Sequence, residues 1–438
     1  MLALSCFPIA NVQLGQGQEK MRLTRREVLK LGLTLPPTAM MLLGSLGTAR
    51  ANTAQLSDGQ RQQLLEDART AWQFFEQPGR HLPGLAPANI WPEGPNQFGS
   101  YRIVTMWDVG SILLATISAH SLSIINDAEL SKRIAGLDSF LRKAIYRYRG
   151  AQLPNFRSSI DTTKSIEAGY DATDTARLFI ALHVADRRKI PGLNAREIIA
   201  SWDLDRTVRD GEICSIKQGK LSPAEFYVYR YYVSRAYDLW KVKHKPVTAA
   251  QSPTASEASR KAFIEELKNI GPISSEPSLS EVVELGPSPH SEVILDILDK
   301  AQELRYEETS RLTCVSESPV DQEPWFTYQG YDLARNGEAA WTVYPWKTEK
   351  RWDTPEFAKK FRMVSSKAAF LWFAAYPSAY TEKLWQHVRE HARAPKFGFY
   401  PGVYEASGKP SRNIDVNTNA TILEAVAYAI NGRKPLLS

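Results

Sequence analysis

The stretch that decides how the chain is read is Gly398-Phe-Tyr-Pro-Gly-Val-Tyr-Glu-Ala-Ser-Gly-Lys-Pro-Ser-Arg-Asn-Ile-Asp-Val-Asn-Thr-Asn-Ala-Thr-Ile-Leu-Glu-Ala-Val-Ala-Tyr428. Two tyrosines and a carboxylate, Tyr400, Tyr404 and Glu405, precede a turn rich in Gly, Pro and Ser. The apolar run that follows predicts a helix, which ends before Asn431-Gly432.

Two amides, Asn417 and Asn419, lie where this helix is predicted to begin. Together with the aromatic side chains and Glu405 they suit a hydroxyl-rich ligand such as a sugar. Sugar rings stack on aromatic faces, and sugar hydroxyls bond to amides and carboxylates. The alternative is a packed corner in which Asn417 or Asn419 only caps the helix. The stretch alone leaves both interpretations open.

The first fifty-one residues are predicted to be an export signal. Residues 24–30 contain paired arginines, residues 31–46 are uncharged and mostly apolar, and Ala49-Arg50-Ala51 fits a cleavage site. This pattern resembles a twin-arginine signal. It implies a bacterial protein that the twin-arginine machinery exports in folded form to the periplasm, with the mature chain starting near Asn52. A retained membrane anchor is the alternative, but Pro36-Pro37 interrupts the run, which is short for the ~20 residues of a span.

Charge and composition narrow the classes of partner. Residues 1–51 carry six Lys or Arg and two Asp or Glu, so removing them lowers the formal charge from +6 to +2. The basic balance therefore belongs to the signal, and no nucleic-acid partner is predicted. All eleven Trp lie after residue 51, which indicates either a large core or a carbohydrate cleft. The sequence does not give the oligomeric state.

Two cysteines, Cys214 and Cys314, remain after the signal. An even pair in an oxidising compartment predicts a disulfide. Closing so long a loop stabilises a fold by up to ~4–5 kcal/mol in the chain-entropy model. Two separately buried thiols are the alternative.

Hydrophobic periodicity predicts about ten to twelve helices and no sustained strand in residues 52–438. Helices that are apolar all round, such as those beginning near Asp108 and Asp174, alternate with amphipathic ones, such as 128–146. This alternation predicts an all-α, single-domain (α/α)6-type toroid with an inner and an outer ring. The ligand cleft is expected at the end where the inner helices begin. The Pro- and Ser-rich segment 245–289 is predicted to be a mobile insertion that contains one short charged helix near residues 257–269.

Acidic residues lie at predicted helix starts or in aromatic loops. Two carboxyls perform glycoside hydrolysis, one donating a proton and one activating water ~6.5–9.5 Å away in an inverting enzyme. Acids at helix starts are also favoured by the helix dipole, by ~0.3–1 kcal/mol, so each acid taken singly is better explained as a cap. An aromatic residue accompanies two of them, which makes these two the better catalytic candidates. The five acids are Asp108 (after Trp107), Asp174, Glu323 (before Pro324-Trp325), Asp332 and Glu405.

No motif for a metal or cofactor is convincing. His387-Val-Arg-Glu-His391 matches the pattern H-x-x-E-H, and two histidines four positions apart share a helix face. No third ligand is evident, however. The sequence also contains no phosphate-binding loop, dinucleotide fingerprint or nucleophile elbow. We therefore predict no metal and no cofactor.

Four motifs together resemble the bacterial family called domain of unknown function 3131, over roughly residues 60–435. That family is similar to α/α-toroid glucan hydrolases and glycoamylase-like domains, and it accompanies glycosyltransferase systems of the cell envelope. The resemblance implies a toroid fold and, by analogy, carbohydrate chemistry. The motifs are Trp-Asp-Val-Gly-Ser at 107–111, Asp174-x-x-Arg-Leu at 174–178, Glu-Pro-Trp-Phe at 323–326, and Gly-Val-Tyr-Glu at 402–405 followed by Asn-Thr-Asn at 417–419.

Residues and resemblance together predict an exported carbohydrate-active protein. One hypothesis is an inverting glycoside hydrolase that acts on an envelope or extracellular glucan, with Asp108 and Glu323 as acid and base and Glu405 as the next candidate. The alternative is a non-catalytic periplasmic protein that binds glycans or assists polysaccharide synthesis. A polysaccharide lyase is a third, weaker option. The predicted oligo- or polysaccharide-binding residues are Trp107, Asp174, Trp325, Tyr328, Asp332, Tyr400, Tyr404, Asn417 and Asn419.

Overall fold

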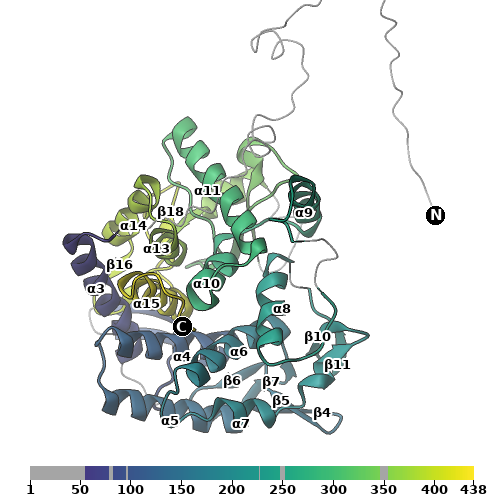
Figure 1. The fold of residues 1–438 in the computed structure, drawn as a ribbon. Coiled ribbons are helices and arrows are strands. Elements are labelled where there is room, and N and C mark those ends of the chain that lie inside the picture. The colour runs from purple at the N-terminus through teal and green to yellow at the C-terminus, as the bar shows by residue number, and fades with distance from the viewer. Residues whose placement is uncertain (1–54, 78–81, 95–96, 226, 247–251, 346–353) are drawn as a thin grey trace, which may run out of the picture. The chain divides into compact units, whose positions relative to one another are not determined.

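The computed structural model describes residues 55–438, apart from 78–81, 95–96, 226, 247–251 and 346–353 (Figure 1). Every element below belongs to one contact unit, residues 46–438. The predicted export signal, residues 1–51, lies outside the described residues. Within the described ranges, no helix is long and apolar enough to cross a membrane.

Six helices form a closed inner ring in which each helix contacts the next and the last contacts the first (Figure 1). They are apolar nearly all round because neighbours in the ring cover both of their flanks. Gly110 lies where the first two of these helices meet, and a Cβ there would come within 2.8 Å of the Leu178 amide nitrogen. The inner helices are α4 (Met106–Ser121), α6 (Ala172–Arg187), α8 (Arg230–Leu239), α10 (Ser275–Leu285), α13 (Ser366–Ala375) and α15 (Val416–Ile430).

Further helices surround this ring and confirm the predicted toroid. Five of them pack on inner helices: α3 on α15, α5 on α4, α7 on α6, α11 on α10 and α14 on α13. The sixth, α9, contacts the short helix η3 ahead of α8. Their bounds are α3 (Asp58–Trp72), α5 (Asp127–Lys143), α7 (Ala195–Ala200), α9 (Glu257–Ile270), α11 (Pro289–Thr309) and α14 (Ala379–His391). The remaining helices are α12 (Pro355–Phe361), η1 (Gln73–Glu76), η2 (Leu204–Thr207), η3 (Tyr227–Tyr229) and η4 (Gly337–Ala340).

The structure has the charged helix that was predicted within residues 245–289, as α9, but it contradicts a mobile insertion for the part that forms the inner helix α10. All residues of α10 are buried. The Pro and Ser content misled the prediction, because Ser274 and Pro277 belong to the first turn of this helix. Three glutamates of α10 are buried as well, and they find partners inside the ring.

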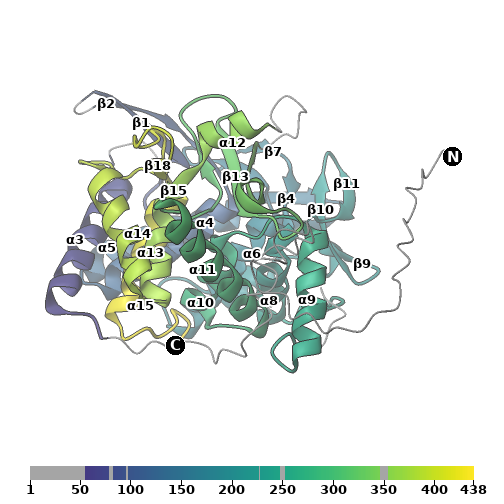
Figure 2. The same cartoon turned by 90° about the horizontal axis from the view of Figure 1, so that it is seen from above.

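The segments between the helices form short antiparallel strands, and most of these strands lie at one end of the helices (Figure 2). The main hairpins are β1–β2, β10–β11 and β13–β14. Strands of two to six residues are too short to give a sustained alternation, which is why periodicity did not predict them. The hairpin strands are β1 (Asn89–Gly94), β2 (Gln97–Tyr101), β10 (Glu212–Lys217), β11 (Lys220–Pro223), β13 (Phe326–Tyr331) and β14 (Trp341–Pro345).

Several of the other strands pair segments that are distant in the sequence. β19 pairs with β1, β15 with β18 and β3 with β6, so loops between different helices are joined at this end. Their bounds are β3 (Ile103–Thr105), β4 (Ile145–Tyr148), β5 (Ala151–Pro154), β6 (Arg157–Ser159), β7 (Ser165–Glu167), β8 (Gly169–Tyr170), β9 (Val208–Arg209), β12 (Ser318–Pro319), β15 (Met363–Ser365), β16 (Arg393–Ala394), β17 (Gly398–Phe399), β18 (Gly402–Tyr404) and β19 (Ile414–Asp415).

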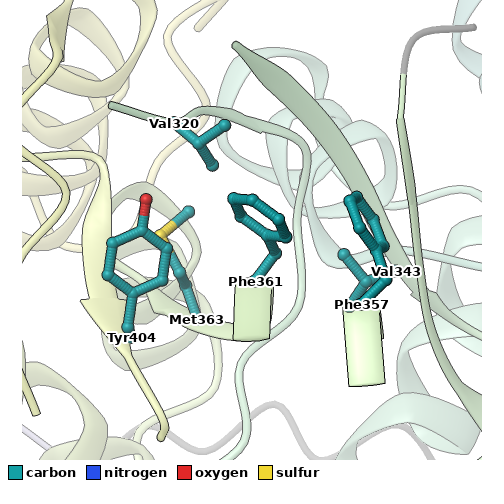
Figure 3. Close-up of a cluster of buried hydrophobic side chains, with 6 residues drawn as sticks. All are labelled: Val320, Val343, Phe357, Phe361, Met363 and Tyr404. Atoms are coloured by element: carbon teal, nitrogen blue, oxygen red, sulfur yellow. The ribbon is translucent and has the colours of Figure 1, made fainter. Parts of the chain in front are cut away.

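A separate apolar cluster fixes the β13–β14 hairpin to the ring (Figure 3). Phe357 and Phe361 of α12 lie with ring centroids 4.6 Å apart and pack on Val343 of β14. Met363 and Tyr404 close the cluster from β15 and β18. The hairpin is therefore held firmly where it borders the site described below.

The predicted disulfide is not formed. Cys214 and Cys314 are both buried free thiols. Cys214 lies on β10, where its Sγ donates to the Glu212 carbonyl at 3.3 Å. Cys314 lies instead between α11 and β12, and its carbonyl accepts a hydrogen bond from Ser365. The alternative of two separately buried thiols is the one that the structure shows.

Candidate active site

A cavity of about 1330 Å³ opens at the end of the ring where α4, α6 and α15 begin. The β10–β11 and β13–β14 hairpins supply further walls. Its volume exceeds the ~300–1,000 Å³ that suits a drug-sized ligand. The cavity therefore has room for several sugar rings.

Three inner helices bring the acids of their first turns into this cavity. Asp108 Oδ2 accepts the Thr105 amide at 2.8 Å, and Asp171 Oδ1 accepts two amides of α6 at 3.0 and 3.1 Å. Asp415 Oδ1 accepts an amide of α15 at 2.7 Å. The first amides of a helix need such acceptors. Because these three helices begin at one end of the ring, the residues that cap them also collect acidic charge there, with Asp174 beside Asp171.

Crowding of these carboxyls makes several of them weak acids. Burial raises the pKa of Asp108 to about 6, and the nearby charge of Asp415 adds to the effect. Burial also raises the pKa of Asp174 well above its ordinary value, and Asp171, Asp108 and Glu317 reinforce this shift. Like charges in a poorly solvated site cannot all ionise together. The cavity therefore holds protons at neutral pH.

Glu317, which directly precedes β12, is the strongest candidate for a proton donor. Burial raises its pKa to about 7, and the charge of Glu276 contributes. Lys367 and the hydroxyl of Tyr229 act in the opposite direction because they stabilise the charged form. A carboxyl with a pKa near neutrality is suited to general acid catalysis.

Aromatic side chains form the walls between these acids. Trp107 packs edge-on against Tyr229 with ring centroids 5.5 Å apart, and Tyr328 stacks on Tyr344 at 5.7 Å. The Trp107 Nε1 is buried without a hydrogen-bond partner among the described residues. Trp325 stands at the mouth with 62% of its surface exposed. Aromatic faces beside unsatisfied polar groups suit a ligand with apolar faces and hydroxyl edges.

A buried polar network lies beneath the cavity floor and crosses the ring. Arg177 Nε donates to Ser111 Oγ at 2.6 Å, and Ser111 Oγ donates to Asn417 Oδ1 at 3.0 Å. Asn417 Nδ2 donates to Glu276 Oε1 at 2.6 Å, and Glu276 forms an ion pair with Lys367. Asn417 and Lys367 line the cavity, so the network fixes its floor.

The far end of this network carries an excess acid. Arg177 Nη1 and Nη2 donate to Glu284 and Glu424, each at 2.7 Å, and Tyr232 donates to Glu284 at 2.7 Å. Burial and the charge of Glu284 raise the pKa of Glu424 well above its ordinary value, although Arg177 opposes the shift. Glu276, Glu284 and Glu424 are three buried acids that face two buried cations, Arg177 and Lys367. Charge balance therefore favours one proton among the three acids, and Glu424 is our candidate to hold it.

A family model described as "Protein of unknown function (DUF3131)" matches residues 66–432. The chain belongs to this family. No match was found among curated proteins.

Solved structures share the fold of this DUF3131 protein at low sequence identity. A Bacteroides caccae protein with a proposed glucoamylase assignment has a TM-score of 0.55 at 16% identity, over 86% of this chain and 94% of its own. A Chitinophaga pinensis endo-β-1,2-glucanase in complex with sophorotriose and glucose has a TM-score of 0.55 at 13% identity, over 87% and 94%. A Talaromyces funiculosus endo-β-1,2-glucanase with sophorose has a TM-score of 0.51 at 10% identity, over 88% of each chain.

The DUF3131 cavity brings together half of the site residues that the sequence suggested. Asp108, the catalytic candidate of α4, lines it. The binding candidates that also line it are Trp107, Asp174, Trp325, Tyr328 and Asn417. Their convergence comes from the shared starting end of the inner helices and from the β13–β14 hairpin.

Two predicted catalytic residues lie elsewhere. Glu323 is exposed and is not among the cavity-lining residues, although Pro324 and Trp325 after it are. Both Glu405 oxygens accept hydrogen bonds from Arg305, each at 2.9 Å, which makes this pair a bidentate structural link. Neither residue is among those that line the cavity.

Four predicted binding residues have structural roles outside the cavity. Asn419 is fully buried and bonds to the Phe399 backbone through both amide atoms. The Tyr404 hydroxyl donates to Asp321 at 2.8 Å, while its ring belongs to the cluster of Figure 3. Asp332 forms an ion pair with Arg335 at 3.0 Å, and Tyr400 is part-buried beside β17. The packed-corner interpretation is therefore correct for most of the opening stretch, and Asp415 caps its helix.

Four further charged residues line the cavity and were not predicted from the sequence: Asp171, Glu317, Lys367 and Asp415. A signal existed for two of them. Lys367 is a lone cation in the apolar run of α13, and Asp415 is a lone acid between Ile414 and Val416 directly before a buried helix. Charges in such surroundings must be paired or functional. Glu317 gave no comparable signal, because no aromatic residue or helix start accompanies it.

Proposed function

We propose that this DUF3131 protein is a glycoside hydrolase that acts on a glucan. Glu317 donates the proton to the leaving oxygen, and Asp108 activates the attacking water. The observation that supports this assignment is a pair of carboxyls in one aromatic cavity with different proton affinities. At pH 7 the Asp108 carboxyl, with a pKa of about 6, is mostly ionised, whereas Glu317, with a pKa of about 7, keeps a proton in about half of the molecules.

We propose an inverting mechanism. Asp108 lies in the first turn of α4 and Glu317 precedes β12, so the two carboxyls come from different segments of a cavity of about 1330 Å³, which leaves room for a water molecule beside the sugar. We therefore propose that water, not a carboxylate, attacks the sugar.

A β-1,2-glucan is the first substrate to test, because solved structures of this fold include endo-β-1,2-glucanases. The residue pattern of 1–51 supports export by the twin-arginine machinery. We accordingly propose a periplasmic protein that meets an envelope or extracellular glucan.

Reducing-sugar release from a panel of glucans tests the assignment. Glu317→Gln and Asp108→Asn should each lose on the order of 10²–10⁴-fold in kcat, the usual contribution of one acid or base, with circular dichroism unchanged. Glu323→Gln is the matched control, an exposed carboxyl outside the cavity, and should keep full activity. Full activity in Glu317→Gln would reject the assignment. Glucan binding without any hydrolysis by the wild type would favour the glycan-binding alternative.

A further inference from the structure

A second, smaller cavity adjoins the first. It has a volume of about 450 Å³ and lies between the β9–β10 turn, the end of α9 and the chain before η3. Ala224, Glu225 and Tyr227 line both cavities. The two cavities therefore share these three residues, and Tyr227 is the aromatic side chain among them.

Tyr227 is unusually exposed for an aromatic residue. Among the described residues, five large hydrophobic side chains are exposed, and three of these line the main cavity: Tyr101, Tyr227 and Trp325. Tyr227 is 58% exposed and Trp325 is 62% exposed. Large apolar side chains held in water usually mark a surface that binds something.

The backbone supports the same conclusion independently. Tyr227 has φ of 44° and Trp325 has φ of 70°, and they are the two aromatic residues with positive φ in the described part of the chain. Bulky residues rarely adopt this conformation, and they are retained in it where function needs the side chain placed. Both strained aromatics project at the cavity mouth rather than into the core.

Resting on the proposed hydrolase function, we infer that one glucan chain occupies both cavities. The chain passes from the main cavity across the Tyr227 ring, and the smaller cavity binds further sugar rings of the same chain. Its lining supplies hydrogen-bonding groups for sugar hydroxyls, namely Glu225, Arg230 and Asn269. The preferred substrate is thus a long chain, cleaved at a bond away from its end.

The arrangement of polar groups around Tyr227 fits a sugar-binding site. The Tyr227 hydroxyl donates to Glu225 at 3.5 Å, and Arg230 Nε donates to the Tyr227 carbonyl at 3.3 Å. These bonds hold the ring edge and the backbone, while the ring face stays open for stacking. Arg230 also lies 3.9 Å from Glu266, so its guanidinium is oriented on the wall of the smaller cavity.

The test is the dependence of kcat/KM on chain length. Linear β-1,2-glucan oligosaccharides from the disaccharide to the decasaccharide are assayed with wild type, Tyr227→Ala and Tyr227→Phe. Tyr227→Ala should lose about tenfold on the long chains, the effect of ~1.4 kcal/mol, and nothing on the shortest chain that the wild type cleaves. Tyr227→Phe keeps the stacking face and should behave like the wild type. Trp91→Ala is the control, because Trp91 is 41% exposed but lines neither cavity.

The outcomes separate this inference from the proposed function. Hydrolysis with the same length dependence in wild type and Tyr227→Ala overturns the two-cavity path and leaves the hydrolase assignment intact. If the wild type cleaves no glucan, binding of the same oligosaccharides is measured by calorimetric titration instead. The two-cavity path is supported if affinity rises with oligosaccharide length in the wild type but not in Tyr227→Ala. If none of these oligosaccharides binds, the two-cavity path is overturned.

Discussion

The Glu317 carboxyl shows how single contacts set the chemistry of the cavity. Burial raises its pKa to about 7, while Tyr229 and Lys367 keep it from rising further. Asp108, with a pKa of about 6, must be ionised for the same reaction. The pH profile of kcat/KM should therefore be a narrow bell, with its optimum between about pH 6 and pH 7.

The Tyr229 hydroxyl gives this profile a specific test. The hydroxyl of Tyr229 favours the charged form of Glu317, so removing that hydroxyl in Tyr229→Phe should raise the pKa of Glu317. The alkaline limb of kcat/KM should move to higher pH, while the acidic limb, set by Asp108, stays in place. Tyr344→Phe removes another hydroxyl of the cavity wall and should shift neither limb. An unmoved alkaline limb in Tyr229→Phe would contradict the role given to Glu317.

At the scale of elements, the inner helices are joined by polar contacts as well as by apolar packing. Arg177 of α6 links Glu284 of α10 to Glu424 of α15. If Glu424 carries the shared proton, then Glu424→Gln reproduces its donor and its acceptor and should change the free energy of unfolding by less than about 1 kcal/mol.

Glu284→Gln is the matched variant for this prediction. Its new amide would face the donors of Arg177 and Tyr232, so we expect a loss of about 3–5 kcal/mol, as for other broken buried pairs. Urea unfolding of both variants gives the comparison. Equal losses in the two variants would show that the proton does not reside on Glu424.

The elements also show which parts of the fold could be predicted. The alternation of apolar and amphipathic helices gave the two rings, because burial imposes a 3.6-residue period that the sequence records. The buried helix α10 was missed because of its Pro and Ser content, and its glutamates Glu276, Glu281 and Glu284 gave no sign that the helix is buried. Its partners, such as Arg177 and Lys367, are distant in the sequence, and periodicity carries no information about such pairs.

At the scale of the molecule, the site could be predicted only in part. Asp108 and Asp174 were found because helix starts at one end of a toroid must converge. Glu405 was predicted to lie in the cleft, but it pairs with Arg305 and is not a cavity-lining residue, because the same sequence features also suit an ion pair. Which acid faces a ligand and which faces an arginine depends on loop paths, and no local pattern records these.

The convergence of acids at one end of the toroid costs stability, and this cost predicts how the molecule responds to pH. A carboxyl with a raised pKa in the folded state stabilises the fold below its unfolded pKa, and that contribution is lost as pH rises through the folded value. Asp108, Asp174 and Glu317 all have raised pKa values. The free energy of unfolding should therefore fall between about pH 4 and pH 8.

Asp174→Asn isolates this effect, because it removes the acid that faces Asp171, Asp108 and Glu317 together. At pH 8 we expect the variant to melt at a higher temperature than the wild type, with a free energy of unfolding larger by an amount on the order of 1–2 kcal/mol. At pH 5 the gain in stability should be smaller, because protonation has already relieved the repulsion. Activity should fall in the same variant, since the cavity trades stability for function. Glu323→Gln, with its exposed carboxyl outside the cavity, should give no gain at either pH. Equal or lower stability of Asp174→Asn at pH 8 would mean that Asp174 is held by favourable contacts and not by the ring of helices around it.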